Sequence, residues 1–147
     1  MSETHANVRT VSIVGFGLMS PNLSNITIIV VEDDNDVRRY VGAFLDLSGA
    51  NVVSARNGRE GLEAIKNNHP NMVLSDIKMP EMDGFGLMRE IRALGPDAGG
   101  SVPVVAMTAC LIQGERASIR DAGFQACLPK PFTPDKLLET ILAVLND

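Results

Sequence analysis

The sequence contains no tryptophan and few other aromatic residues: five phenylalanines and one tyrosine occur among its 147 residues. It also lacks any apolar run of about 18 residues, so we expect no segment that spans a membrane. Basic residues are outnumbered, because 13 lysines and arginines face 18 aspartates and glutamates, which gives a net charge of −5. This acidic balance argues against direct binding of nucleic acid.

Cysteine is also scarce, with Cys110 and Cys127 as its two occurrences. Their spacing matches neither a CxxC motif nor a zinc site. Two cysteines in a chain of this size are typical of a reducing cytoplasm, where we expect the protein to reside. Both are expected to act as small packing residues.

Apolar residues make up 45% of the chain and charged residues 21%, a composition typical of one globular domain with a core. Residues 1–25 differ from the remainder. Their apolar segment, Val11–Met19, has one basic residue closely before it and no clear cleavage site after it, which disfavours a secretion signal. The pair Gly15 and Gly17 lacks the third glycine of a dinucleotide-binding loop. We therefore predict a flexible N-terminal extension or linker over residues 1–25 and one domain over residues 26–147.

From residue 26 onward, short apolar runs alternate with segments of helical periodicity. We expect strands at residues 26–31, 51–55, 72–74, 102–107 and 124–128. The apolar spacing predicts helices over residues 37–47, 85–94 and 111–122. A further helix is expected after an Asn57-Gly58 turn, up to residue 68, and the last helix from Pro134 to residue 145. Five such units predict an α/β fold, in which helices cover both faces of a parallel sheet and all strands end at one edge.

The predicted strand at residues 72–74 leads to Asp76 and then to a loop that contains Pro80 and Gly84. Open parallel sheets bind their ligands at the carboxyl ends of their strands, so Asp76 lies where a site can form. The proline and the glycine end the strand, and Asp83 can cap the helix that follows. Taken alone, Asp76 would more often be an acidic residue that simply ends a strand.

Polar residues follow four of the five predicted strands: Glu32 and Asp33 follow the first, Asp76 the third, Thr108 the fourth and Lys130 the fifth. Three carboxylates at one edge repel one another, and a hard divalent cation such as Mg²⁺ offsets that repulsion. A hydroxyl group and an ammonium group beside the cation can hold a phosphoryl group. In such a site a carboxylate can be the nucleophile and form an acyl phosphate.

Each of these residues also has a purely structural interpretation. Thr108 could be a plain strand-end hydroxyl, and Lys130 could be a surface lysine. The run Glu32-Asp33-Asp34 could cap the next helix. The occurrence of all these residues at strand ends favours a functional site.

The chain from about residue 26 to residue 145 resembles the receiver domain of two-component response regulators. The matching motifs occur in the order and at the spacing of that family: Val30-Val31-Glu32-Asp33, Asp76 with Met79-Pro80-Glu81-Met82-Asp83-Gly84, Thr108-Ala109, and Lys130-Pro131-Phe132. The resemblance implies a doubly wound, flavodoxin-like sandwich of three layers, with five parallel strands in the order 2-1-3-4-5. It also implies a cis peptide bond between Lys130 and Pro131.

The same resemblance implies that Asp76 accepts a phosphoryl group from a histidine kinase or a histidine phosphotransfer protein. Thr108 would sense the phosphoryl group, and Lys130 would pair with it. The implied Mg²⁺ ligands are Asp33, Asp76 and the backbone carbonyl of Lys78, with Glu32 assisting through water. Such a domain catalyses only its own phosphorylation and dephosphorylation, so we do not expect a classical enzyme.

Three positions depart from the family pattern. Cys127 stands three positions before the lysine, where the family often has an aromatic residue. Lys78 and Cys110 occupy two positions at which the family tunes dephosphorylation. These departures concern the lifetime of the phosphoryl group and not the identity of the site.

Three functions remain open at this level. A phosphorylation switch is favoured. Because the chain stops soon after its last predicted helix, we expect it to contain no DNA-binding output domain. We expect the switch to act on a downstream protein partner, and the protein to be a monomer or weak dimer. An aspartyl-nucleophile phosphatase would usually carry an Asp-x-Asp pattern after its first strand, where this chain has Glu32-Asp33-Asp34. An interaction module that has lost phosphorylation is disfavoured, because all five site positions carry competent residues.

Overall fold

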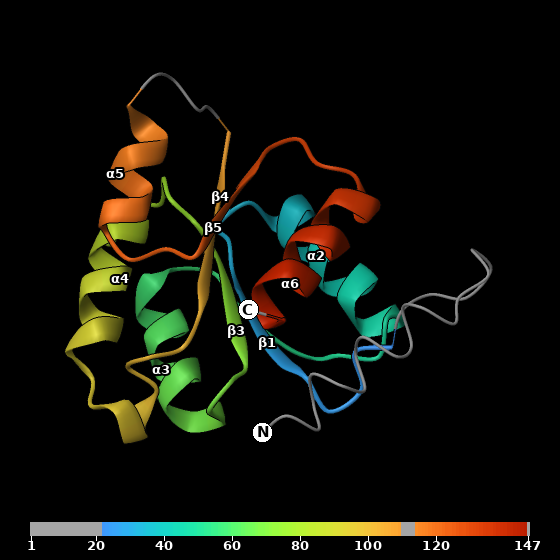
Figure 1. Ribbon diagram of the computed structural model, residues 1–147, viewed down its shortest axis with the longest axis horizontal. Helices are drawn as coiled ribbons and strands as arrows, with labels where there is room; N and C mark the ends of the chain where they lie inside the picture. Colours follow the sequence, from blue (N-terminus) through green and yellow to red (C-terminus); the bar gives the residue numbers. More distant parts are fainter. Residues whose placement is uncertain (1–21, 110–113, 147) are drawn as a thin grey trace.

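The computed structural model describes residues 22–109 and 114–146. They form five parallel strands in the order β2-β1-β3-β4-β5, with helices on both faces of the sheet (Figure 1). This is the doubly wound, flavodoxin-like arrangement predicted from the sequence. The strands are β1 (Thr27–Val31), β2 (Asn51–Ala55), β3 (Met72–Asp76), β4 (Val104–Thr108) and β5 (Ala126–Pro129). The helices are α2 (Asn35–Leu47), α3 (Gly58–Asn68), α4 (Gly84–Ala93), the 3-10 turn η1 (Pro96–Ala98), α5 (Glu115–Asp121) and α6 (Pro134–Leu145).

The three central strands, β1, β3 and β4, are covered on both faces. β3 and β4 are buried along their whole length, and β1 is buried from its second residue. A strand covered on both faces needs apolar residues at consecutive positions, which explains the uninterrupted apolar runs of β1 and β4. The register places Val31 beside Ser75, Asp76 beside Met107, and Thr108 beside Pro129. The strands therefore end close to one another at the carboxyl edge.

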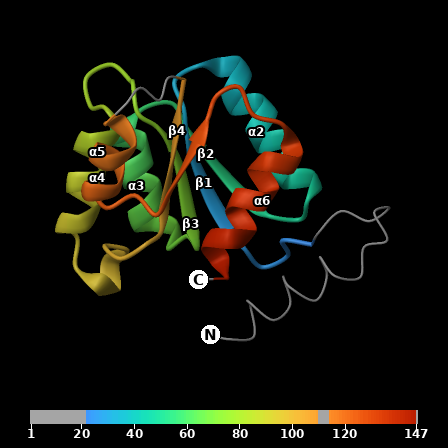
Figure 2. The same cartoon turned by 45° about the horizontal axis from the view of Figure 1, so that its top comes forward.

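Two apolar clusters lie on opposite faces of the sheet. The first joins α2 and α6 to one face, through residues such as Leu45 and Ile141. The second joins α3, α4 and α5 to the other face, through residues such as Ile65, Ile91 and Ile119 (Figure 2). Within the described ranges, no helix is long and apolar enough to cross a membrane.

Side-chain caps fix the starts of four helices. The carboxylate of Asp34 accepts hydrogen bonds from two backbone N–H groups in the first turn of α2. The caps of α3, α4 and α6 are Asn57, Asp83 and Thr133. Each cap satisfies N–H groups that the first turn of a helix leaves unpaired. The predicted caps at residues 83 and 133 are confirmed, as is Pro134 as the first residue of α6.

Helix boundaries differ from the sequence-based predictions at several points, and α2 begins at Asn35, two residues earlier than predicted. Gly58 was expected in a turn but is the first residue of α3, because the side chain of Asn57 caps that helix. The fourth predicted helix, over residues 111–122, is observed as Glu115–Asp121 among the described residues; positions 111–113 lie outside them. The turn η1 was not predicted at all.

Two strands begin two residues later than predicted. The N–H of Val102 donates to the carbonyl oxygen of Gly99 at 3.2 Å, and the next residue is a proline without an N–H, so β4 begins at Val104. The N–H of Phe124 donates to the carbonyl oxygen of Ile119 at 3.3 Å, which closes the end of α5 and delays β5.

Apolar packing extends to residues that precede β1. Leu23 is wholly buried, and its N–H donates to the carbonyl oxygen of Ser48 at 2.7 Å. Its own carbonyl accepts the N–H of Ile26 at 3.0 Å. Residues 1–21 lie outside the described ranges, so the extension predicted over residues 1–25 stays a prediction there.

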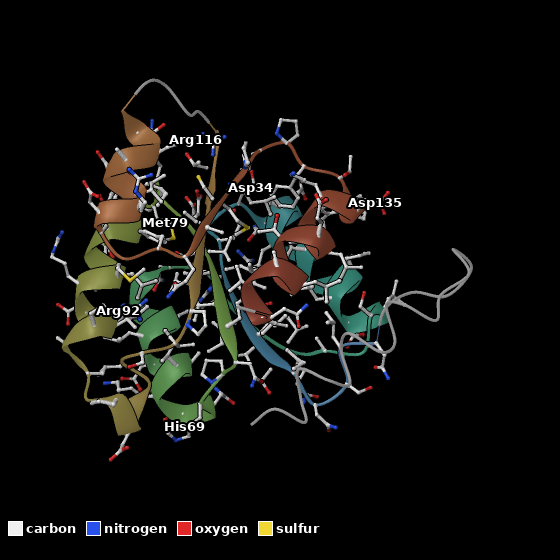
Figure 3. The ribbon with its side chains drawn as sticks, in the orientation of Figure 1. Asp34, His69, Met79, Arg92, Arg116 and Asp135 are labelled. Carbon is white, nitrogen blue, oxygen red and sulfur yellow. The ribbon has the colours of Figure 1, made fainter. Side chains whose placement is uncertain are left out.

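Arg92 connects α4 to segments on either side of it. Its Nη1 donates to the carbonyl oxygens of Gly100 at 2.9 Å and Val102 at 2.8 Å, and its Nη2 donates to that of Gly123 at 3.2 Å. Figure 3 shows Arg92 on the side of the molecule that carries α4 and α5. One side chain thus ties the end of α5 to the start of β4.

Candidate functional site

The five residues singled out from the sequence lie at the carboxyl edge of the sheet, toward the top of Figure 1. Glu32 and Asp33 follow β1, Asp76 ends β3, Thr108 ends β4, and Lys130 follows β5. Their surroundings differ: Glu32, Asp76 and Thr108 are buried, Lys130 is half-buried and Asp33 is exposed. The site is therefore open to solvent on the side of Asp33.

Lys130 bridges two of the carboxylates. Its Nζ lies 2.7 Å from Oε1 of Glu32 and 3.4 Å from Oδ2 of Asp76. Burial alone would lower the pKa of Lys130, but the contacts with Glu32 and Asp76 outweigh burial and raise it. The amine therefore stays protonated at neutral pH and presents a positive charge beside Asp76.

Glu32 is a wholly buried carboxylate whose charge is only partly compensated. Burial raises the pKa of Glu32 to about 7, while Lys130 and the N–H of Asp34 act in the opposite direction. The N–H of Asp34 donates to Oε2 at 3.1 Å. The contact between Oε1 and Lys130 is an ion pair by distance, but in the described part of the chain Oε1 has no partner aligned for a hydrogen bond. An additional cation near Oε1 would favour the ionised form.

Asp76 has one oxygen that is held by the backbone and one that faces Lys130. Oδ1 accepts the N–H of Ile77 at 2.8 Å. Oδ2 is the oxygen that lies 3.4 Å from the lysine, and the side chain as a whole is 9% exposed. The arrangement fixes the carboxylate in one orientation, with Oδ1 bonded to the backbone and Oδ2 directed toward the ammonium group.

The three carboxylates fit one small divalent cation. One oxygen each from Glu32, Asp33 and Asp76 lies within 4.8 Å of the other two. In octahedral Mg²⁺ coordination, opposite ligands lie about 4.2 Å apart and adjacent ligands about 3 Å apart, so the carboxylates would close in around an ion that all three bind directly. The charges also fit, because three carboxylates face one ammonium group. Oxygen ligands and an excess of negative charge are what Mg²⁺ requires.

Thr108 and Lys130 are joined through the backbone. The N–H of Lys130 donates to the carbonyl oxygen of Thr108 at 2.7 Å, directly after the pairing of Thr108 with Pro129. The peptide bond between Lys130 and Pro131 is cis, which confirms the expectation drawn from the family resemblance.

The remaining predicted positions have separate surroundings. Asp34 caps α2, and hydrogen bonds from the N–H of Val37 lower its pKa, so the capping interpretation holds for this member of the acidic run. Lys78 lies in the loop after β3 with an exposed side chain, and its carbonyl as a metal ligand stays a prediction. Cys127 is half-buried on β5 beside Ala106, and Cys110 lies outside the described residues.

An apolar groove of about 420 Å³ adjoins the site between α2 and the loop after β5. Its lining consists of Val37, Tyr40, Ala109, Lys130, Pro131 and Phe132. The rings of Tyr40 and Phe132 have centroids 6.5 Å apart, and Tyr40 is 43% exposed. The sequence did not predict this groove, because Val37 and Tyr40 lie within the helix expected over residues 37–47, where apolar spacing indicates only a face that packs on the sheet. The available signal was the aromatic residue directly after Lys130-Pro131.

Fold and site together define a class of protein: a doubly wound α/β domain with a cluster of carboxylates and a lysine at the carboxyl edge of its sheet. The sequence family described as the response regulator receiver domain matches residues 28–142, and the chain belongs to this family. Receiver domains are signalling domains of two-component systems and not classical enzymes. Phosphorylation and Mg²⁺ binding are general features of the family, and its members interact with histidine kinases and phosphotransfer proteins.

Among sequence relatives, the response regulator MprA of Mycobacterium sp. (strain KMS) is 38% identical over 121 residues, which cover 82% of this chain and 51% of MprA. A protein of Leptolyngbya boryana named as an uncharacterized 14.6 kDa protein is 35% identical over 119 residues, which cover 81% of this chain and 89% of that protein. The chain thus spans about half the length of the named response regulators that it matches.

Solved structures of receiver domains have the same fold. Chemotaxis protein CheY4 of Vibrio cholerae matches with a TM-score of 0.76 at 27% identity, covering 81% of this chain and 98% of that chain. A CheY-like receiver domain protein of Methanospirillum hungatei JF-1 matches with a TM-score of 0.75 at 30% identity, covering 84% and 95%. The signal receiver domain of a histidine kinase from Syntrophus aciditrophicus matches with a TM-score of 0.70 at 27% identity, covering 82% and 89%.

Proposed function

We propose that Asp76 accepts a phosphoryl group from a phosphohistidine on a histidine kinase or a histidine phosphotransfer protein. The observation that carries this proposal is the position of Asp76 Oδ2, 3.4 Å from the Lys130 ammonium group, within a cluster of carboxylates that fits Mg²⁺. A fixed carboxylate beside a fixed positive charge suits phosphoryl transfer, in which positioning and charge stabilisation supply most of the catalysis.

In the proposed transfer, Oδ2 of Asp76 forms a bond to phosphorus while the bond between phosphorus and the imidazole nitrogen breaks. The electron pair of that bond goes to the nitrogen, and the imidazole takes up a proton from solvent. Lys130 pairs with one phosphoryl oxygen, and the hydroxyl of Thr108 donates to another. When bound, Mg²⁺ would neutralise charge on the phosphoryl oxygens. The proposed ligands of Mg²⁺ are Glu32, Asp33, Asp76 and the carbonyl of Lys78.

The same proposal covers the partners and the setting of the chain. The phosphorylated state alters a surface that a downstream protein binds, and the net charge of −5 is in keeping with no direct contact with nucleic acid. We place the protein in the cytoplasm as a monomer or weak dimer. The receiver domain in this proposal is residues 26–147, with residues 1–25 as its extension.

The proposal is tested by the intact mass of the full chain after incubation with acetyl phosphate and Mg²⁺. We expect the wild type to gain the mass of one phosphate and Asp76→Asn to gain none, because the amide is a poor nucleophile. The matched control is Asp97→Asn, which changes an exposed aspartate on η1 and should leave the gain intact. Full labelling of Asp76→Asn, or no labelling of the wild type, would contradict the proposal.

A further inference from the structure

The loop between β3 and α4, residues 77–83, carries the proposed ligand Lys78 and is fixed at both ends. At its start, the N–H of Ile77 donates to Oδ1 of Asp76 at 2.8 Å. At its end, the N–H of Gly84 donates to the carbonyl oxygen of Ile77 at 2.7 Å. A Cβ on Gly84 would lie 2.6 Å from the backbone oxygen of Asp76, so the loop closes tightly on the strand that carries the acceptor.

The far side of the same loop rests on the first turn of α3. A Cβ built on Gly58 would lie 2.7 Å from Sδ, 2.9 Å from Cγ and 3.1 Å from Cβ of Met82. On its other side, Cγ of Met82 lies 3.3 Å from the Cβ position of Gly86 in α4. The side chain of Met82 therefore occupies a notch between two helix starts, and the notch exists because Gly58 and Gly86 have no side chains.

A methyl group at position 58 would force Met82 to move. The thioether end of the side chain is flexible and could turn away. The contact with Cβ of Met82 is different, because Cβ is attached directly to the backbone of the loop. At 3.1 Å this contact requires Cβ of Met82 to shift by a few tenths of an ångström, and the loop backbone to which Cβ is attached has to follow.

We propose that Gly58, on a helix that contributes no residue to the carboxylate cluster, is a positioning residue for the Mg²⁺ site. The notch that Gly58 leaves for Met82 sets the position of the loop, and through the loop it sets the position of the Lys78 carbonyl relative to Asp76. The inference rests on the proposed function, because the ligand set is the one proposed there. It adds a residue of α3 to the determinants of cation affinity.

The test is a titration of the full chain with Mg²⁺, followed by amide NMR. We expect Gly58→Ala to weaken Mg²⁺ binding by about tenfold, the range found when residues behind metal ligands are changed. The matched control is Gly95→Ala: Gly95 has open space around its Cβ position and a negative φ, so alanine fits there and Mg²⁺ binding should not change. Alanine has a higher helix propensity than glycine, so the Gly58→Ala variant should not have a lower melting temperature than the wild type because of a weakened α3.

A second variant separates the notch from other effects of the methyl group. Met82→Gly removes Cβ together with the rest of the side chain that the methyl group would strike, and it should itself weaken Mg²⁺ binding because the loop loses its anchor. In the Met82→Gly background, adding Gly58→Ala should cause no further loss, which is a non-additive result. Equal losses from Gly58→Ala in both backgrounds, or no loss in either single variant, would overturn the proposal.

The cation-free protein gives an independent measurement. Without Mg²⁺, the amide shifts of Lys78, Met82 and Gly84 should change in Gly58→Ala and stay unchanged in Gly95→Ala. If the wild type itself fails to bind Mg²⁺, the proposed function fails, and these shifts still decide whether Gly58 positions the loop. Unchanged shifts across residues 77–84 in Gly58→Ala would overturn the inference.

Discussion

The three carboxylates of the cluster differ in what surrounds them. Lys130 pairs with Glu32 and Asp76, whereas Asp33 is exposed at the open side of the site. A ligand that is exposed costs little to desolvate and can still contribute a full negative charge to a bound cation. The cluster therefore combines two carboxylates that the lysine orients with one that faces solvent.

We expect Asp33→Asn to weaken Mg²⁺ binding by at least about tenfold, because it removes one charge while keeping the shape of the side chain. Titration of the full chain with Mg²⁺ measures the effect. The control is Asp36→Asn, an exposed aspartate on α2 that pairs with Arg39. Equal affinities of Asp33→Asn and wild type would remove Asp33 from the ligand set.

Cys127 offers a test of pH dependence. Burial raises the pKa of its thiol; of the nearby charges, Arg116 lowers it and Glu115 raises it by smaller amounts. The thiolate is the reactive form, and a raised pKa keeps the group protonated to a higher pH, so alkylation should be slow near about pH 7. In a Cys110→Ser background, we expect the rate of iodoacetamide labelling to rise at a higher pH in the folded chain than in the same chain unfolded by urea. A midpoint at or below that of the unfolded chain would show that Cys127 is an activated thiol.

Thr108 is the last residue of β4 and Lys130 directly follows β5, so α5 and β5 lie between these two residues along the chain. We expect a phosphoryl mimic to shift amide resonances mainly between Thr108 and Phe132, because movement of the Thr108 hydroxyl acts on the segment that follows it. Thr108→Ala should still take up phosphate on Asp76 but show smaller shifts in that segment. The control is Thr140→Ala, a half-buried threonine of α6 whose hydroxyl donates to the carbonyl oxygen of Lys136 in its own helix. Shifts confined to the loops of Asp33 and Asp76 would contradict this prediction.

Element types were predictable from the sequence wherever local chemistry decides them. The β-branched run of β1, the Asp83 cap and the Thr133-Pro134 start of α6 are all local signals, and all three hold. The start of β4 was predicted two residues early, because hydropathy does not reveal that the N–H of Val102 is already bonded in a turn. Gly58 was assigned to a turn, since its real constraint is a methionine 24 positions later in the chain.

The candidate site was predictable to the extent that topology dictates it. Parallel strands must end at one edge, so the convergence of Glu32, Asp76 and Lys130 follows from their positions after strands. The different roles within the acidic run were not predictable, since Asp34 caps a helix while Glu32 faces the lysine, and one sequence does not reveal the direction in which each side chain points. The groove between α2 and the loop after β5 depends on packing between distant segments, which one sequence does not reveal.

For the molecule as a whole, stability should depend on the core between the sheet and α6. Leu137 is wholly buried in the first apolar cluster, whereas Leu47 is 84% exposed. We expect Leu137→Ala to lower the free energy of unfolding by about 2–5 kcal/mol, because it leaves a cavity. Leu47→Ala should change it by less than about 0.5 kcal/mol. Urea unfolding of both variants measures the difference, and similar losses would mean that the core is not where the structure places it.

Arg92 holds the C-terminal end of α5 in a fixed position. Its guanidinium group holds the carbonyl of Gly123 to the carbonyls of Gly100 and Val102, so that end of the helix is pinned to the amino end of β4. A helix that is held at one end can tilt about that end but cannot shift along its own axis. α5 has seven residues and is about 10 Å long, so a swing of about ten degrees would carry its Gly114 end by roughly 2 Å while Gly123 stays in place. Small movements near Thr108 would then be amplified into larger movements at the Gly114 end of α5, which lies on the same edge of the molecule as the site (Figure 1).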